Sequence, residues 1–251
     1  MYVNTGENRQ PKKLSVIFSS QLREVITERE FVTMARKTKE AAQETRNHLL
    51  DTAEHVFSER GVSRTSLAEI AETAGVTRGA VYWHFKNKAD LFDAMMARVT
   101  LPMEQMTARI GDATIQNPLA YIKASAMGVL LQLASDEQTQ RVFDIVNHKC
   151  EYVDDMEVLR KRNHESCMAC IDHVETGFKN AIKKGLLPRG VNARRAARGM
   201  HALIDGMIVN WLLNHDYLSL KRDAEPIIDC YLVGLGANAA QLKSKLKRNA
   251  K

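Results

Sequence analysis

TSLAEIAETAGVTRGAVYWHF, from Thr65 to Phe85, has the pattern of two short helices joined by a tight turn. Ser66 followed three residues later by Glu69 forms a capping box, in which each side chain satisfies an amide that a helix start leaves unpaired. Gly75 is the residue type that ends a helix in the left-handed conformation, and Thr77 is a favourable N-cap for a second helix. This stretch therefore predicts a helix-turn-helix.

The second helix of this pair has a composition that suits contact with a DNA duplex. Its first residues are small, which lets a backbone approach phosphates and base edges, and its last turn carries rings with hydrogen-bonding edges. A helix that only packs into a core would carry more aliphatic side chains than Ala80 and Val81. Lys88, at the start of the next helix, would point its charge at a phosphate together with the backbone amides there. We therefore expect these residues to contact DNA: Thr65, Ser66, Thr77, Arg78, Gly79, Ala80, Tyr82, Trp83, His84 and Lys88.

A longer segment around this motif resembles a known family. Residues 34–92, MARKTKEAAQETRNHLLDTAEHVFSERGVSRTSLAEIAETAGVTRGAVYWHFKNKADLF, closely resemble the N-terminal domain of TetR-family repressors. Within that family the segment is most similar to the AcrR-type regulators of multidrug efflux pumps. The resemblance implies a homodimeric transcriptional repressor that binds double-stranded DNA and is released by a small hydrophobic or cationic effector.

The residues before this segment show no sustained helical stripe, and we expect residues 1–33 to be poorly ordered. Family members of this type commonly begin at the equivalent of Met34, so the resemblance raises a second explanation, an upstream extension of an over-long reading frame. The expected organisation is an N-terminal extension at 1–33, a three-helix DNA-binding domain at 34–92, a helical ligand-binding and dimerisation domain at 93–238, and a basic tail at 239–251.

Composition places the chain among ordinary globular proteins, with 251 residues, 45% hydrophobic and 26% charged. It has no run of about 18 apolar residues and no signal-peptide core, so we expect a cytoplasmic protein that does not use a membrane. The net charge of +6 is concentrated in the tail, because five of the six charges come from Lys243, Lys245, Lys247, Arg248 and Lys251. DNA binding therefore depends on a few positioned donors more than on a strongly positive field.

The remaining chain predicts helices and no strand alternation, which gives an all-α fold. The helix after the motif contains Leu91 to Val99 and would link the two halves of the chain. After Leu101-Pro102 the sequence changes to long helices rich in Leu, Met, Ile and Ala. Pro226 is compatible with the last helix because that helix is expected to start near Asp223, which leaves the proline in its first turn. The expected helices are approximately 45–60, 90–99, 119–133, 136–147, 156–184, 193–214 and 223–235.

The last two long helices carry more apolar surface than one packed face needs. One face can pack inward and the other against a second copy, which predicts a two-fold four-helix dimer contact. Such a dimer would place two recognition helices about 34–36 Å apart, the spacing of half-sites on a palindromic operator.

Polar residues within apolar helices indicate where an effector would bind. His201 and Asp205 are four residues apart, so they share a helix face, either as a mutually satisfied pair or as a polar anchor in an apolar ligand pocket. The family resemblance favours the pocket. By position, its walls would be Ile122, Ala126, Val129, Phe143, Asn147, Cys167, Cys170, Val174, His201, Ile204, Asp205 and Ile208.

Two alternatives remain: a constitutive DNA binder without a ligand, and a hydrolase-type enzyme that uses His201 and Asp205. No nucleophile motif or phosphate loop accompanies those residues, so we expect no catalytic residues and no cofactor. His164 and His173, on either side of Cys167 and Cys170, would lie on opposite faces of one helix, so we expect no metal site. A redox role for the two cysteines stays open.

Overall fold

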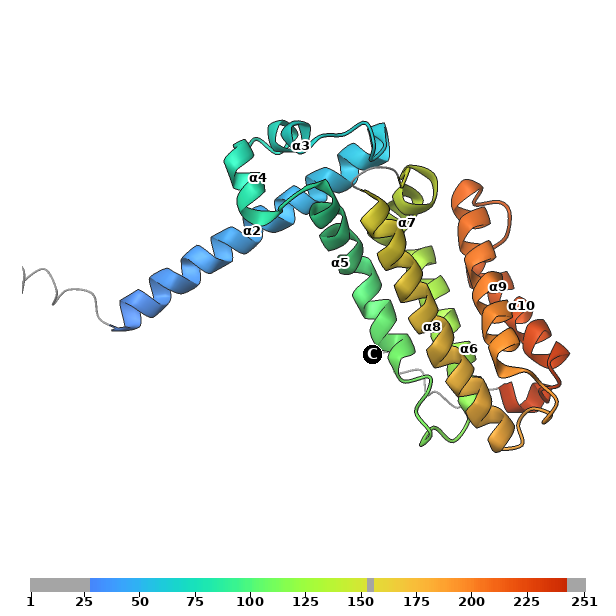
Figure 1. Cartoon of the computed structure of the whole chain (residues 1–251). Coiled ribbons are helices and arrows are strands. Elements are labelled where there is room, and N and C mark those ends of the chain that lie inside the picture. Colours follow the sequence, from blue (N-terminus) through green and yellow to red (C-terminus); the bar gives the residue numbers. More distant parts are fainter. Residues whose placement is uncertain (1–27, 153–155, 243–251) are drawn as a thin grey trace, which may run out of the picture. The chain divides into compact units, whose positions relative to one another are not determined.

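The computed structural model describes residues 28–152 and 156–242, and these residues form helices and no strand (Figure 1). The all-α prediction is therefore confirmed. The α-helices are α2 (Glu28–Arg60), α3 (Leu67–Thr73), α4 (Arg78–His84), α5 (Lys88–Ala108), α6 (Pro118–Ser135), α7 (Glu137–His148), α8 (Glu157–Lys183), α9 (Ala193–Leu213) and α10 (Leu220–Gly234), followed by the 3-10 turn η2 (Ala239–Leu242). Among these elements none has the length and apolar content needed to cross a membrane.

The chain divides into two compact units, Met1–Asn47 and His48–Lys251. In the first unit, α2 begins at Glu28, so the last residues of the segment expected to be poorly ordered are helical. The rest of that segment, 1–27, lies outside the described residues, and so do 243–251 of the basic tail.

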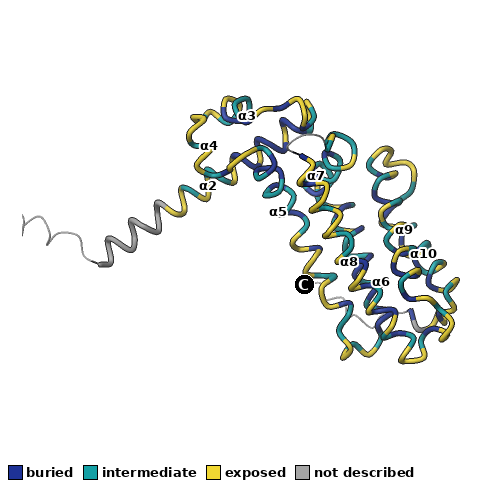
Figure 2. The backbone as a smooth tube through the Cα atoms, viewed as in Figure 1, coloured by how far each residue is buried: buried dark blue, intermediate teal, exposed yellow. Residues whose placement is uncertain are grey.

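In the second unit, the last turns of α2 pack with α3, α4 and the first half of α5 around one core, and we call this assembly the head. Phe57 of α2 and Phe92 of α5 are fully buried there, with ring centroids 6.0 Å apart. Figure 2 marks the buried positions along these helices in dark blue. The core of the head thus ties the helix-turn-helix to the start of α5.

The helix-turn-helix forms through the local contacts that its sequence predicts. Ser66 Oγ accepts a hydrogen bond from the Glu69 amide, and the Ser66 amide donates to Glu69 Oε2 over 2.7 Å. The Ser66 bonds hold the pKa of the Glu69 carboxyl below its usual value. Gly75 has a φ of 67°, a conformation that favours glycine, and Thr77 Oγ1 accepts from the Ala80 amide. The capping prediction is confirmed in each of these details.

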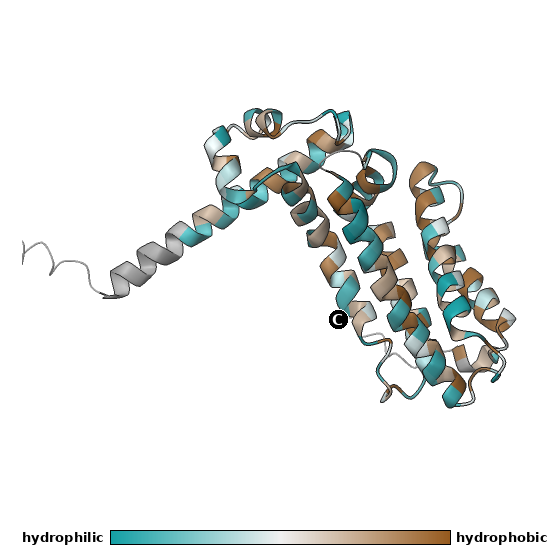
Figure 3. Cartoon of the chain, viewed as in Figure 1, coloured by the Kyte–Doolittle hydropathy of each residue, from teal (hydrophilic) through white to brown (hydrophobic). Residues whose placement is uncertain are grey.

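The C-terminal helices form a bundle with a second core, in which α8 packs on α9 and α10 packs on α6. Figure 3 shows how apolar residues alternate with hydrophilic ones along these helices. Lys123 of α6 is buried and reaches α10, where its Nζ lies 2.6 Å from Asp229 Oδ1 and 2.9 Å from Glu225 Oε1. This ion-pair cluster fixes α10 against α6.

Three helix boundaries differ clearly from the predicted ones: α2 begins at Glu28 and not near Thr45, and the other two differences each lie at a proline. The helix expected to reach about Val99 continues through Pro102 to Ala108, and α10 begins at Leu220, so Pro226 lies in its interior and not in its first turn. Each proline is solvent-exposed and costs its helix one intrahelical hydrogen bond. The buried residues on both sides of each proline pack into the same core, which keeps the helix continuous.

Candidate functional site

The exposed face of α4 carries most of the residues expected to contact DNA. Val81 points into the core, while Tyr82 and Trp83 are 60% and 72% exposed, an unusual position for large aromatic side chains. The ring of His84 meets the Trp83 ring edge to face, with centroids 4.5 Å apart. Ser66, Thr77, Arg78 and Gly79 are exposed beside these rings, and Ala80 is half-buried. This face therefore presents hydrogen-bonding groups and aromatic rings to solvent.

Two of the residues expected to contact DNA also make hydrogen bonds within the protein. Thr65 is only 2% exposed, and its hydroxyl donates to the Gly61 carbonyl over 2.8 Å. Lys88 Nζ donates to the carbonyls of Val62 and Thr65, over 2.9 and 3.0 Å. The lysine therefore braces the loop before α3.

A shallow basic concavity of about 410 Å³ lies beside the exposed face of α4. Arg64 and Lys86 line it together with Ser66 and Tyr82, and both cations are exposed. Neither was expected from the sequence, because they belong to the loops on either side of the motif, although their charge was a usable signal. Exposed cations next to hydroxyl donors are the groups that bind a DNA phosphate.

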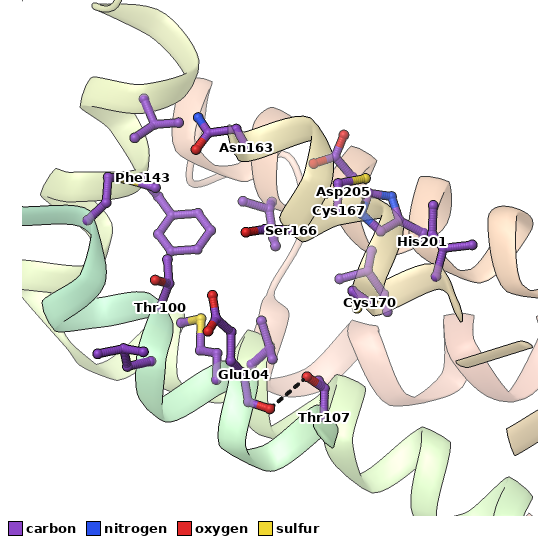
Figure 4. Close-up of a pocket in the computed structure, with 18 of the residues that line it drawn as sticks. Thr100, Glu104, Thr107, Phe143, Asn163, Ser166, Cys167, Cys170, His201 and Asp205 are labelled. Atoms are coloured by element: carbon purple, nitrogen blue, oxygen red, sulfur yellow. Dashed lines mark hydrogen bonds between the residues drawn. The ribbon is translucent and has the colours of Figure 1, made fainter. Parts of the chain in front are cut away.

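A cavity of about 440 Å³ lies among α5, α6, α7, α8 and α9, and we call it the effector cavity (Figure 4). All of the residues expected from the sequence to form a pocket line it: Ile122, Ala126, Val129, Phe143, Asn147, Cys167, Cys170, Val174, His201, Ile204, Asp205 and Ile208. Most of these side chains are apolar, as in sites that hold drug-like molecules.

One wall of the effector cavity was missed by sequence reasoning. It comes from α5, which was expected to end before most of these residues, and consists of Asp93, Met96, Ala97, Thr100, Leu101, Met103, Glu104 and Thr107. The remaining lining residues that were not expected are Ile110, Val146, Arg162, Asn163, Ser166 and Ile171. The helical spacing of Met96, Met103 and Thr107 on both sides of Pro102 was the signal that this wall existed.

The charged groups in the effector cavity are mainly acidic. Asp93, Glu104 and Asp205 line it against one guanidinium, that of Arg162, which forms an ion pair with Asp93. The carboxylates of Glu104 and Asp205 leave the cavity with a negative balance. A positively charged group on a bound molecule would therefore be favoured over a negative one.

His201 contacts a residue of another helix. Its Nε2 lies 3.2 Å from Cys167 Sγ, across from α9 to α8, a partner that the spacing of His201 and Asp205 did not indicate. Burial raises the pKa of the Cys167 thiol, and the nearby charge of Asp205 raises it further. Burial also raises the pKa of Cys170, which lines the same cavity one turn along α8.

Helix α7 contacts both the effector cavity and the head. Phe143, Val146 and Asn147 line the cavity, while Arg141 Nε donates to Glu54 Oε1 of α2 over 2.7 Å. At the end of α7, the Lys149 carbonyl accepts from the Val62 amide over 3.0 Å. A change in the cavity that moves α7 would therefore reach the head directly.

Comparison with known proteins identifies similar chains over most of this length. The family description "Bacterial regulatory proteins, tetR family" matches residues 49–95, and "MAATS-type transcriptional repressor, C-terminal region" matches residues 117–236. The HTH-type transcriptional regulator TtgR of Pseudomonas putida is 40% identical over 196 residues, which cover 78% of this chain and 93% of TtgR.

Solved structures show the same similarity. NalD, the secondary repressor of the MexAB-OprM multidrug efflux pump in Pseudomonas aeruginosa, is 36% identical with a TM-score of 0.72, covering 78% of this chain and 98% of NalD. SmeT of Stenotrophomonas maltophilia, in complex with triclosan, is 30% identical with a TM-score of 0.73, covering 81% of this chain and 99% of SmeT.

Proposed function

The chain belongs to the tetR family of bacterial regulatory proteins, and from this premise we propose that it represses a multidrug efflux operon as a homodimer. A hydrophobic or cationic compound that fills the effector cavity releases the repressor from the operator. The observation that carries this proposal is that one continuous helix, α5, runs from the DNA-reading motif to the effector cavity.

The two halves of α5 have different surroundings. At its start, Asn87 Oδ1 accepts from the Asp90 amide, and the Lys86 amide, in the turn after α4, donates to Asp90 Oδ2 over 2.9 Å. The next turns carry Phe92 into the core of the head, and the turns after them form a wall of the cavity. A ligand that shifts the second half must either bend this helix or move the head with it.

Exposed apolar residues on the last two helices support the dimer. Leu213 and Tyr217, at the end of α9 and just after it, and Val233 of α10 are large apolar side chains that remain exposed in the single chain. A two-fold contact between α9 and α10 of two copies would cover them and form a four-helix interface. The two heads would then read the half-sites of a palindromic operator, about 34–36 Å apart.

Ligand release is tested by operator affinity. A duplex selected by the protein from a random library serves as operator, and fluorescence anisotropy measures its Kd with and without triclosan or tetraphenylphosphonium. We expect each compound to raise the operator Kd by about tenfold or more, which corresponds to a coupling of about 1.4 kcal/mol. Tetraphenylphosphonium should be effective at a lower concentration than an anion of similar size, because of the acidic lining. No change of Kd with any of these compounds would leave the constitutive regulator as the better description.

The two alternatives are less well supported. A constitutive DNA binder needs only a solid dimerisation core, whereas this half of the chain contains a partly open cavity of about 440 Å³ with His201 and Asp205 on its wall. The hydrolase alternative has only the spacing of His201 and Asp205 behind it, since the sequence shows no nucleophile motif, phosphate loop or paired-carboxylate spacing to accompany them. The relatives described above are transcriptional regulators.

The placement of the DNA-reading face leads to a mutational prediction. Changing Arg78 or Tyr82 to alanine should raise the operator Kd by about tenfold or more, because each removes an exposed donor from α4. Lys183→Ala, at the end of α8, removes an equal charge far along the chain and should leave the Kd nearly unchanged. If Arg78→Ala and Lys183→Ala weaken operator binding equally, only the overall charge of the protein matters, and the DNA-reading face has been placed wrongly on α4.

A further inference from the structure

The effector cavity contains a thiol paired with an imidazole. Cys167 Sγ and His201 Nε2 are 3.2 Å apart, and both residues line the cavity from neighbouring helices. Figure 4 shows them together with Asp205, which lies one turn beyond His201 on α9. An unprotonated Nε2 at this distance can accept the thiol proton.

The surroundings of Cys167 keep it unreactive until that proton is removed. Its raised pKa, caused by burial and by the charge of Asp205, leaves the thiol protonated near neutral pH, so it is a poor nucleophile toward molecules in solution. The Asp205 carboxylate that disfavours a free thiolate would stabilise the imidazolium formed when His201 takes the proton. The pair is therefore suited to base-assisted attack on a molecule held beside it.

We propose that the effector cavity captures soft electrophiles, compounds with an alkene conjugated to a carbonyl group, by covalent addition to Cys167. His201 Nε2 removes the thiol proton while the sulfur forms a bond to the β-carbon. The alkene π-electron pair moves to the α-carbon and the carbonyl, and the imidazolium returns the proton to the α-carbon. This addition has no leaving group and involves no net oxidation or reduction, so no oxidant is required.

The cavity favours those electrophiles that bind in it non-covalently before they react. Flat apolar molecules would stay among side chains such as Ile122 and Phe143, and a bound molecule next to the sulfur reacts as if present at very high concentration. Cys170 lines the same cavity one turn away along α8 and serves as an internal reference, because it has no imidazole partner among the hydrogen bonds of the described residues. Burial raises the pKa of both thiols, so the decisive comparison is the effect of His201→Asn on each of them. Cys230 is exposed on α10 and outside the cavity.

The capture reaction is independent of DNA, but its consequence rests on the proposed function. An electrophile attached to Cys167 would occupy the cavity permanently, so it would act as an effector that dilution does not remove. A reversible ligand of the same shape would release the operator only while it is present.

The test uses the full chain with Cys150→Ser and Cys230→Ser, which leaves the two cavity thiols. N-phenylmaleimide is the electrophile, and N-phenylsuccinimide, which lacks the alkene, is the matched non-covalent control. Intact mass and peptide mapping over time should show Cys167 modified about tenfold faster than Cys170 or more. His201→Asn should slow modification of Cys167 by about tenfold or more and leave Cys170 unchanged, because only Cys167 uses this base.

Several outcomes would contradict the proposal. Equal rates of modification at the two cysteines, or an equal loss of rate at both in His201→Asn, would show that the reagent reacts with any accessible thiol and that His201 does not assist the reaction at Cys167. After removal of free reagent, the labelled protein should still bind the operator poorly. The Cys167→Ser variant, treated in the same way, should regain its operator affinity. Labelling of Cys167 with unchanged operator affinity would overturn the effector role of the adduct. Release by triclosan or tetraphenylphosphonium would still test the proposed function separately.

Discussion

Replacing Phe92 with alanine is expected to lower the free energy of unfolding by about 3–5 kcal/mol. The Phe92 side chain has no exposed surface, and its ring packs at 6.0 Å against Phe57 in the core of the head. Truncation removes apolar burial and leaves a cavity that α2 and α5 cannot fill without moving. Chemical denaturation at a fixed protomer concentration measures the loss, because dimerisation makes apparent stability depend on concentration.

Phe143→Ala is the matched control for this substitution. Phe143 is only half-buried and already faces the effector cavity, so its removal enlarges an existing space. We expect a loss of less than about 2 kcal/mol together with weaker binding of the effector. Equal losses for the two variants would mean that Phe92 is not the centre of the head core.

Replacing Arg141 with methionine is expected to cost about 3 kcal/mol of stability. Arg141 Nε donates to Glu54 Oε1, and the Glu54 residue is only 2% exposed, so the substitution leaves a buried carboxylate without its ionic partner. Gln138 Nε2 still donates to Glu54 Oε2 over 2.9 Å, which places the cost at the lower end of the range for broken buried pairs. Thermal and denaturant unfolding measure the effect.

A double substitution distinguishes a buried charge from lost packing. Glu54→Leu combined with Arg141→Met removes both charges and should recover most of the stability lost by Arg141→Met alone. Arg98→Met, which breaks the exposed ion pair with Asp51, should cost less than about 1 kcal/mol. If the double variant is as unstable as Arg141→Met, the loss is one of packing and the ion pair has no special part in it.

These two contacts lie on the two routes between the effector cavity and the head. Phe92 belongs to α5 and Arg141 to α7, and both helices also line the cavity. In the proposed repressor, a variant that loosens either route while the head stays folded should bind the operator but respond less to an effector. The Glu54–Arg141 double variant is the suitable protein for that measurement, because its stability should be nearly restored.

Local signals predicted the head well because its elements are defined by contacts within a few residues. The Ser66–Glu69 capping box and the Thr77 cap each join groups three residues apart, so their geometry follows from the chain itself. The partner of Lys88 could not be predicted in this way. Its Nζ donates to the Val62 carbonyl, 26 residues earlier in the chain, and that contact depends on how the loop before α3 folds back.

The effector cavity was predicted on one side only. Residues of α6 to α9 could be named by position from the family resemblance, but the α5 wall depended on a helix continuing through Pro102. Local propensity ends a helix at such a residue, since it removes a hydrogen bond and a favourable backbone angle for its neighbour. Tertiary packing of Val99 and Met103 outweighed that cost.

By itself, the amino-acid sequence determined the all-α class, the helix-turn-helix and the exposed aromatic face of α4, because caps, glycine conformations and apolar spacing act over one or two turns. Only the tertiary structure decided that α5 joins the head to the cavity. It also decided that Lys88 braces a loop and that His201 faces Cys167. Those outcomes depend on side chains from different helices meeting in space, and spacing along one helix cannot specify which residue of another helix it will face.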